Sequence, residues 1–229
     1  MADRAPRDPL SRERVLSAAV ALADAGGIEA VTMRGIADEL GCEAMSLYYY
    51  VKGKAELLAG LVEVILDEII AATDAGDAEA DATADPEEWD QAVRRRCLTA
   101  RVVMLRHPWA RGVIAAHDTI PPNSFFIYEK LIGTLVGGGF NYDLAHRAIH
   151  ALGSMVLGFA QELFDPGTDG EDEISAEAME QMAATMPHLT AMAEMAFHEA
   201  GGGLSTCDTQ AEFEFTLSLV LDGLGRARA

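Results

Sequence analysis

The chain has 229 residues, half of them hydrophobic, which is enough for one or two compact domains with a sizeable core. The first fourteen residues are polar and charged, and no apolar run approaches the roughly 20 residues that span a bilayer. We therefore expect no signal peptide, no membrane helix and a cytoplasmic protein. The three cysteines, Cys42, Cys97 and Cys207, lack CxxC or metal-ligand spacing, which argues against disulfides or structural zinc.

The formal net charge is −20, which opposes binding to a polyanion unless the charge is unevenly distributed. Residues 1–60 hold seven basic side chains against nine acidic ones, whereas the remainder holds ten against 28. No Lys or Arg occurs from Ala148 to Gly225. Any contact with nucleic acid is therefore expected near the N-terminus.

Capping and turn residues predict a group of short helices at the start of the chain. Ser11 is a candidate N-cap for a first helix that Gly26-Gly27 ends, and Thr32 is a candidate N-cap for a second. Gly41 stands where a left-handed turn residue is wanted, before a third helix over about residues 43–50. A long fourth helix is expected from Lys54.

Helical periodicity continues to the end of the chain, and convincing strand alternation is absent. Residues 71–85 lack large apolar side chains and are predicted to form a connection. The further helices are expected over about 87–106, 109–117, 123–136, 143–164, 175–199 and 209–224. The protein is thus predicted to be all-α, with about nine to ten helices.

Residues 143–164 carry two adjacent apolar stripes, one of large and one of mostly small side chains. The second stripe includes Ala145, Ile149, Gly153 and Val156. A helix that is apolar on two faces packs against two partners, and small residues allow close approach. We expect this helix and residues 209–224, with Phe213, Leu217, Val220 and Leu224 on one face, to form a four-helix seam in a homodimer.

Residues 31–51 have the layout of a helix-turn-helix: two short helices, a glycine turn, and inward apolar residues that brace them. Such a pair lets one helix enter a major groove while the other seats it. Small side chains, a methionine, tyrosine hydroxyls and basic groups on the outward face suit contacts with bases and phosphates. The candidate DNA contacts are Thr32, Arg34, Ala44, Met45, Ser46, Tyr48, Tyr49, Tyr50 and Lys54.

Two other classes of function compete with DNA binding as interpretations of the sequence. An enzyme is disfavoured because the sequence holds no nucleophile elbow, phosphate loop, HExxH motif or paired-carboxylate layout. A structural helical adaptor has no need of three consecutive tyrosines beside Lys52 and Lys54, since three such residues cannot all face inward on one helix.

The stretch from Leu47 to Leu58, together with Thr32-Met33-Arg34-Gly35-Ile36-Ala37, closely resembles the tetracycline-repressor (TetR) family. The resemblance covers about residues 11–70 and implies a DNA-binding domain over 1–53 and a ligand-binding and dimerisation domain over 54–229. It also implies a homodimer that binds a palindromic operator and that a small effector releases. Repression is the family's usual mode, although the residues themselves leave activation open.

Residues that would hold a metal–tetracycline complex in the family are only partly matched. Ile70 occupies a position where an imidazole is expected, His117 is one register step from a second ligand position, and Glu162 matches a carboxylate. Because Ile70 cannot coordinate a metal, we expect no metal and no other cofactor in the effector site.

The family architecture places the effector cavity between the fourth helix and the middle helices. Its Met-rich, apolar candidates suggest a lipophilic, adaptable effector rather than a phosphorylated sugar. The candidate cavity residues are Leu61, Ile65, Trp89, Cys97, Met104, Trp109, Ile114, His117, Phe126, Met155, Phe159 and Glu162.

Overall fold

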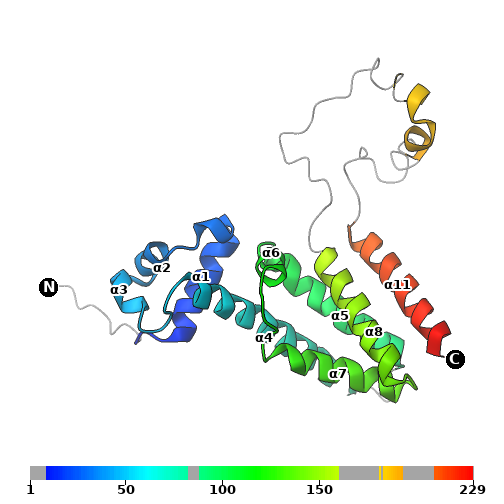
Figure 1. Cartoon of the computed structure of the whole chain (residues 1–229), viewed down its shortest axis with the longest axis horizontal. Helices are drawn as coiled ribbons and strands as arrows, with labels where there is room; N and C mark the ends of the chain where they lie inside the picture. Colours follow the sequence, from blue (N-terminus) through cyan, green and yellow to red (C-terminus); the bar gives the residue numbers. More distant parts are fainter. Residues whose placement is uncertain (1–8, 82–87, 160–180, 182, 193–208, 229) are drawn as a thin grey trace. The chain divides into compact units, whose positions relative to one another are not determined.

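The computed structural model describes residues 9–81, 88–159, 181, 183–192 and 209–228 (Figure 1). Over these residues all regular structure is helical, which confirms the all-α prediction, and the helix numbering runs to α11, slightly above the nine to ten expected. Residues 1–160 and 219–229 form one compact unit and residues 161–218 another. The helix expected over 175–199 lies largely outside the described residues. No helix among those described is long and apolar enough to cross a membrane.

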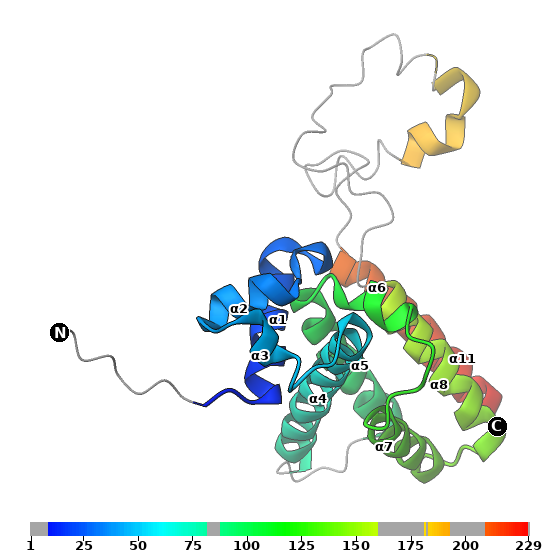
Figure 2. The same cartoon turned by 60° about the vertical axis from the view of Figure 1, so that its left-hand side comes forward.

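Three short α-helices and a 3₁₀ turn gather around the start of a long fourth helix (Figure 2). They are α1 (Arg12–Gly26), η1 (Ile28–Ala30), α2 (Met33–Leu40) and α3 (Ala44–Leu47). Both predicted caps form, because the Ser11 hydroxyl accepts from the Arg14 amide at 3.2 Å and the Thr32 hydroxyl from the Gly35 amide at 3.0 Å. We call η1 and α1–α3 the head.

The turn between α2 and α3 depends on Gly41, whose φ of 62° lies in the left-handed region that side chains disfavour. The third helix is shorter than the predicted 43–50. Only residues 44–47 are α-helical, and residues 48–50 form a turn that leads to Lys54. Leu47 and Val51 are both fully buried, so this short segment is anchored in the head core.

The fourth helix, α4 (Lys54–Asp81), packs closely against α1. A Cβ atom at Gly60 would lie 2.6 Å from a methyl carbon of Leu16, so the two helices are too close here for any side chain at residue 60. Beside this contact, Arg12 and Glu63 form an ion pair at 2.9 Å. The head is therefore seated directly on α4.

The prediction of a connection over residues 71–85 is wrong for its first eleven residues, because α4 continues to Asp81. This part of α4 lacks large apolar side chains. It is attached to later helices by ion pairs. Asp74 pairs with Lys130, and Asp77 pairs with both Arg95 and Arg96. Thr73 is buried, and its hydroxyl donates to the Ile69 and Ile70 carbonyls at 2.8 and 2.9 Å.

Four further helices pack with α4 to form the body, and their bounds lie close to those predicted. They are α5 (Trp89–Arg106), α6 (Ala110–Ala115), α7 (Ser124–Gly137) and α8 (Tyr142–Gly158). α11 (Thr209–Arg228) buries Phe213, Leu217, Leu221 and Leu224, so that Leu221 and not Val220 completes its buried face. Phe215 and Leu219 are exposed on the same helix.

Trp89, predicted to line the effector cavity, instead packs at the start of α5 against the turn between α7 and α8. Its ring contacts Phe140 edge-on at 4.6 Å, and the Arg228 guanidinium lies 5.7 Å from each ring centre. Arg228 also donates to the Gly138 carbonyl at 2.7 Å. A Cβ at Gly138 would lie 2.6 Å from the Trp89 Cβ, so only glycine allows this approach.

A polar contact joins the head to the body at the end of α1. The ring of His107, which is 7% exposed, lies between two carboxylates, with Nδ1 at 2.7 Å from Asp24 and Nε2 at 3.0 Å from Glu68. The Trp109 indole N–H donates to the same Asp24 oxygen at 2.7 Å. Because an ionised carboxylate only accepts, the imidazole is the donor in this contact. The head is thus fastened to the turn between α5 and α6.

Replacing His107 with Ala is expected to lower the free energy of unfolding by about 1–3 kcal/mol, because two half-buried carboxylates lose a shared donor. Urea denaturation followed by circular dichroism measures the change. Arg147→Ala is the control, since it removes an exposed pair with Asp143 and should stay within about 0.5 kcal/mol of wild type. Equal stabilities of the two variants would contradict the role assigned to the contact.

Candidate nucleic-acid interface and cavity

The outward face of α2, α3 and the following turn exposes most of the residues predicted to contact DNA. Met45 is 75% exposed, Tyr49 86% and Tyr48 43%, although these are side chains that proteins ordinarily bury. Thr32, Arg34, Ser46 and Lys54 are also exposed, whereas Ala44 and Tyr50 are half-buried. The Tyr49 and Tyr50 rings make an edge-to-face contact at 5.2 Å. The head therefore presents apolar and aromatic groups to the solvent at one place.

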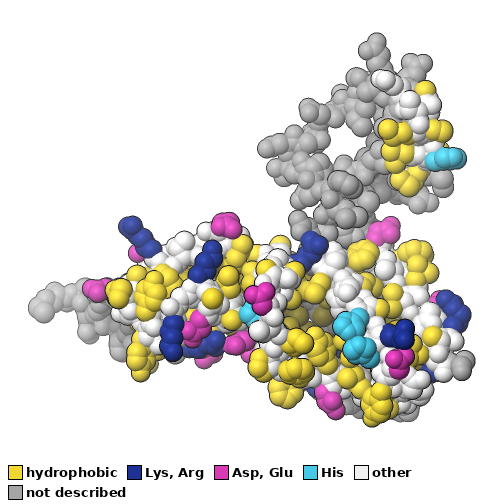
Figure 3. Space-filling model, viewed as in Figure 1, with side chains coloured by type: hydrophobic (Ala, Val, Ile, Leu, Met, Phe, Trp, Pro, Cys, Tyr) yellow, Lys and Arg dark blue, Asp and Glu magenta, His cyan; other side chains and the backbone are white. Residues whose placement is uncertain are grey.

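Basic groups flank this surface (Figure 3). Arg34 stands in the first turn of α2, with its side chain 91% exposed and 4.0 Å from Asp38 one turn later. Lys54 is the first residue of α4. The Lys52 amide donates to the Glu56 carboxylate at 2.9 Å, which caps the N-terminus of this helix. Exposed cations and hydroxyls around a protruding short helix are the groups that contact phosphates and base edges.

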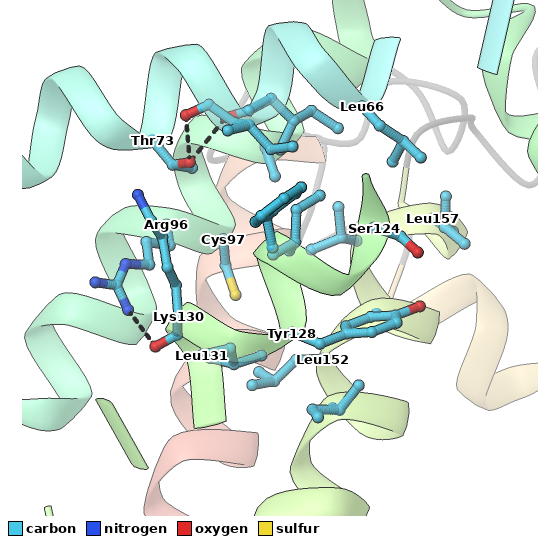
Figure 4. Close-up of a pocket in the computed structure, with 18 of the residues that line it drawn as sticks. Leu66, Thr73, Arg96, Cys97, Ser124, Tyr128, Lys130, Leu131, Leu152 and Leu157 are labelled. Carbon is cyan, nitrogen blue, oxygen red and sulfur yellow. Dashed lines mark hydrogen bonds between the residues drawn. The ribbon is translucent and has the colours of Figure 1, made fainter. Parts of the chain in front are cut away.

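The body contains a cavity of about 200 Å³ between α4, α5, α6, α7 and α8. Its wall is mostly aliphatic and aromatic, and Figure 4 shows the Cys97 thiol among these side chains. The lining residues are Leu66, Ile69, Ile70, Thr73, Arg96, Cys97, Ala100, Met104, Ile114, Ser124, Phe126, Ile127, Tyr128, Lys130, Leu131, Ile149, Leu152, Gly153, Val156 and Leu157.

Several polar side chains of the wall already have partners inside the protein. Thr73 donates to carbonyls of its own helix, and the Ser124 hydroxyl donates to the Pro121 carbonyl at 2.6 Å. Arg96 donates to Asp77 and to Thr134, and it also donates to the Lys130 carbonyl (Figure 4). The wall therefore offers a guest mainly apolar contact.

The charge of Asp77 is held by its two arginines. Burial alone would raise the pKa of this carboxyl group, but hydrogen bonds and the charges of Arg96 and Arg95 outweigh it, so the pKa lies below 3.8. Asp77 stays ionised at neutral pH, and Arg96 is kept at the end of the cavity.

Four of the predicted cavity residues line the wall: Cys97, Met104, Ile114 and Phe126. Three others lie in different surroundings. Leu61 and Ile65 are fully buried in the core that the head shares with α4, and Trp109 belongs to the contact with Asp24. They are therefore not cavity residues in this structure.

Three further predicted residues lie near the cavity but outside its wall. His117 is half-buried in the turn after α6, 3.4 Å from the Thr119 hydroxyl. Met155 is buried on the packed face of α8, and Phe159 ends that helix with its carbonyl accepting from the buried Arg101. Glu162 lies outside the described residues.

Most of the aliphatic wall was absent from the predicted set. The sequence did contain a signal for three of these wall residues. Ile149, Gly153 and Val156 belong to the stripe of mostly small side chains on residues 143–164, and they line the cavity. The second apolar face of this helix therefore faces the cavity. On α4, the cavity residues Leu66, Ile69 and Ile70 follow the predicted residue Ile65 within five positions.

Two family models match the chain and together cover both parts. Residues 15–61 match the model of bacterial regulatory proteins of the tetR family, and residues 83–228 match the tetracyclin repressor-like C-terminal domain. The HTH-type transcriptional repressor DrrR1 of Streptomyces coeruleorubidus is 28% identical over 225 residues, which are 96% of this chain and 79% of that repressor.

Two other similar proteins extend over most of the chain. The class E tetracycline repressor protein of Escherichia coli is 28% identical over 191 residues, covering 82% of this chain and 86% of its own length. Among solved structures, a possible TetR family transcriptional regulator from Streptomyces coelicolor A3(2) is 27% identical, with a TM-score of 0.73 over 95% of this chain and all of the other.

Cys97 is expected to resist alkylation in the folded protein. Burial raises the pKa of its thiol to about 12, against a weaker opposite effect of Arg94 and Arg96, so the nucleophilic thiolate is scarce at pH 8. Iodoacetamide at pH 8, followed by mass spectrometry of peptides, should leave Cys97 unmodified until guanidinium is added. Rapid labelling of native Cys97 would contradict this placement.

The same shift links Cys97 to stability. Since the folded-state pKa is raised, the thiol's contribution to stability is complete below the ordinary value of 9.0 and is lost as the pH rises towards about 12.

Proposed function

The chain belongs to the tetracycline repressor-like (TetR) family of bacterial transcriptional regulators, and from this premise we infer that it is a DNA-binding repressor released when a small effector binds its body. The observation that carries the proposal is the combination of two features in one chain. The head exposes Met45, Tyr48 and Tyr49 beside basic groups, and the body encloses an apolar cavity. We therefore assign no enzymatic activity to the chain.

We assign residues 1–53 to DNA binding and residues 54–229 to ligand binding and dimerisation. Within the head, the proposed DNA contacts are the nine residues inferred from the sequence. α3 enters the major groove, and Arg34 and Lys54 contact the flanking backbone or a base edge. A protein that binds operator DNA works where that DNA is, so we place it in the bacterial cytoplasm.

Regulators of this family bind operator DNA as dimers. A dimer that reads a palindromic operator must hold its two α3 helices about 34–36 Å apart, one helical turn of DNA. The exposed Phe215 and Leu219 on α11 support burial of this helix against a second copy. The body thus sets the distance between the two heads.

The effector acts through differential affinity for two arrangements of the dimer. α4 spans about 24 Å from Lys54 at the DNA-facing surface to Ile70 at the cavity wall. Met104 and Ile114 line the same cavity and flank the turn that holds Asp24 through His107 and Trp109. A guest that displaces these walls moves the head at both of its attachments.

The effector itself is proposed to be lipophilic. The wall is mostly apolar, and its Thr73 and Ser124 hydroxyls have partners within the protein, so a ligand gains chiefly from apolar burial. Ile70 lies in the wall at the point where an imidazole would be needed to hold a metal–tetracycline complex, which supports an effector bound without metal.

Arg34→Ala is expected to weaken operator binding by roughly 5- to 150-fold, the cost of one good contact to a base or phosphate. Electrophoretic mobility shifts on an operator selected from random duplexes measure the loss. Arg147→Ala, which removes an equal charge from an exposed site on α8, should bind as wild type does. Unchanged affinity of Arg34→Ala would count against the proposed interface.

Ile149→Trp is expected to fill part of the cavity and prevent a guest from entering, while operator binding stays intact. Nile red, a neutral lipophilic dye whose fluorescence rises on apolar burial, serves as the probe. Val102→Trp, on an exposed position of α5 outside the wall, is the matched control and should bind the dye normally. Equal dye binding by wild type and Ile149→Trp would refute the cavity as the ligand site.

A further inference from the structure

α8 carries two histidines one helical turn apart, His146 and His150, both exposed. Their ring centres are 4.7 Å apart, and the ring planes are inclined by 79°. Figure 3 shows histidine side chains gathered on the surface over α8. Neither residue lines the apolar cavity, although Ile149 between them does. The pair therefore belongs neither to the proposed DNA interface nor to the effector cavity.

The spacing of the two rings matches that of imidazoles bound to one metal ion. Residues four apart on a helix lie on one face, which is the arrangement of the two zinc-binding histidines in HExxH helices. Two imidazoles at tetrahedral angles around Zn²⁺, each with a Zn–N bond near 2.0 Å, place their ring centres about 5 Å apart. The observed separation of the ring centres, 4.7 Å, is close to this value, and the two rings meet edge to face.

We propose that His146 and His150 chelate one divalent transition-metal ion of the kind that prefers imidazole, such as Zn²⁺. Within the described part of the chain, no group of three or more His, Cys, Asp or Glu side chains suits a metal ion. Water therefore completes the coordination, as in open zinc sites.

The charged neighbours of the pair do not oppose a cation. Asp143 and Arg147, on the same helix, form an ion pair at 3.0 Å, so the arginine charge beside the histidines is balanced. The chain as a whole carries a net charge of −20, which raises the concentration of cations near its surface. The site stands on these observations alone and does not depend on the proposed regulatory function.

Isothermal titration calorimetry of the full chain with ZnCl₂ at pH 7.5 tests the proposal, with one ion expected per chain. His146→Gln and His150→Gln should each weaken binding at least about tenfold, since even the loss of residues that support metal ligands costs that much. His188→Gln, at another exposed histidine on a helical segment, is the matched control and should bind as wild type does.

Two further measurements sharpen the outcome. Mg²⁺, which prefers oxygen ligands, should give no binding at this site. Circular dichroism confirms that both variants are folded. Zinc affinity that is the same in wild type and in the double variant H146Q/H150Q would overturn the proposal.

Discussion

The contact on which the rest of the structure depends is the one made by Asp24 at the end of α1. Its carboxylate accepts from His107 and Trp109, which stand between α5 and α6, while Glu68 of α4 meets the other side of the imidazole. With α4 alone, the head would be attached to the body at one place and could pivot there. The Asp24 contact adds a second attachment, so the position of the head follows the packing around the cavity.

Features whose cause lies within a few residues could be predicted from the sequence. Ser11 and Thr32 cap their helices because each hydroxyl needs only the amide three residues later. Gly41 occupies the turn because residues with a side chain disfavour its left-handed backbone conformation. The all-helical fold followed from such local signals, since periodicity and caps agree. The family was inferred separately, from the resemblance of the stretches Thr32–Ala37 and Leu47–Leu58 to a known family.

Features that depend on distant residues could not be predicted in the same way. α4 extends to Asp81 because Asp74 and Asp77 meet Lys130, Arg95 and Arg96, and the spacing of these residues along the chain does not reveal the pairing. Ile65 and Ile69, one turn apart on α4, both belong to the buried core, yet only Ile69 also lines the cavity. A periodic pattern identifies the inward face of a helix but not which neighbour covers each turn.

The position of Arg228 bears on how this protein should be handled. Its guanidinium covers Trp89 and Phe140 and donates to the Gly138 carbonyl, so the last turn of α11 closes the packing at the start of α5. Trimming that turn would uncover a tryptophan and remove a donor from a backbone oxygen.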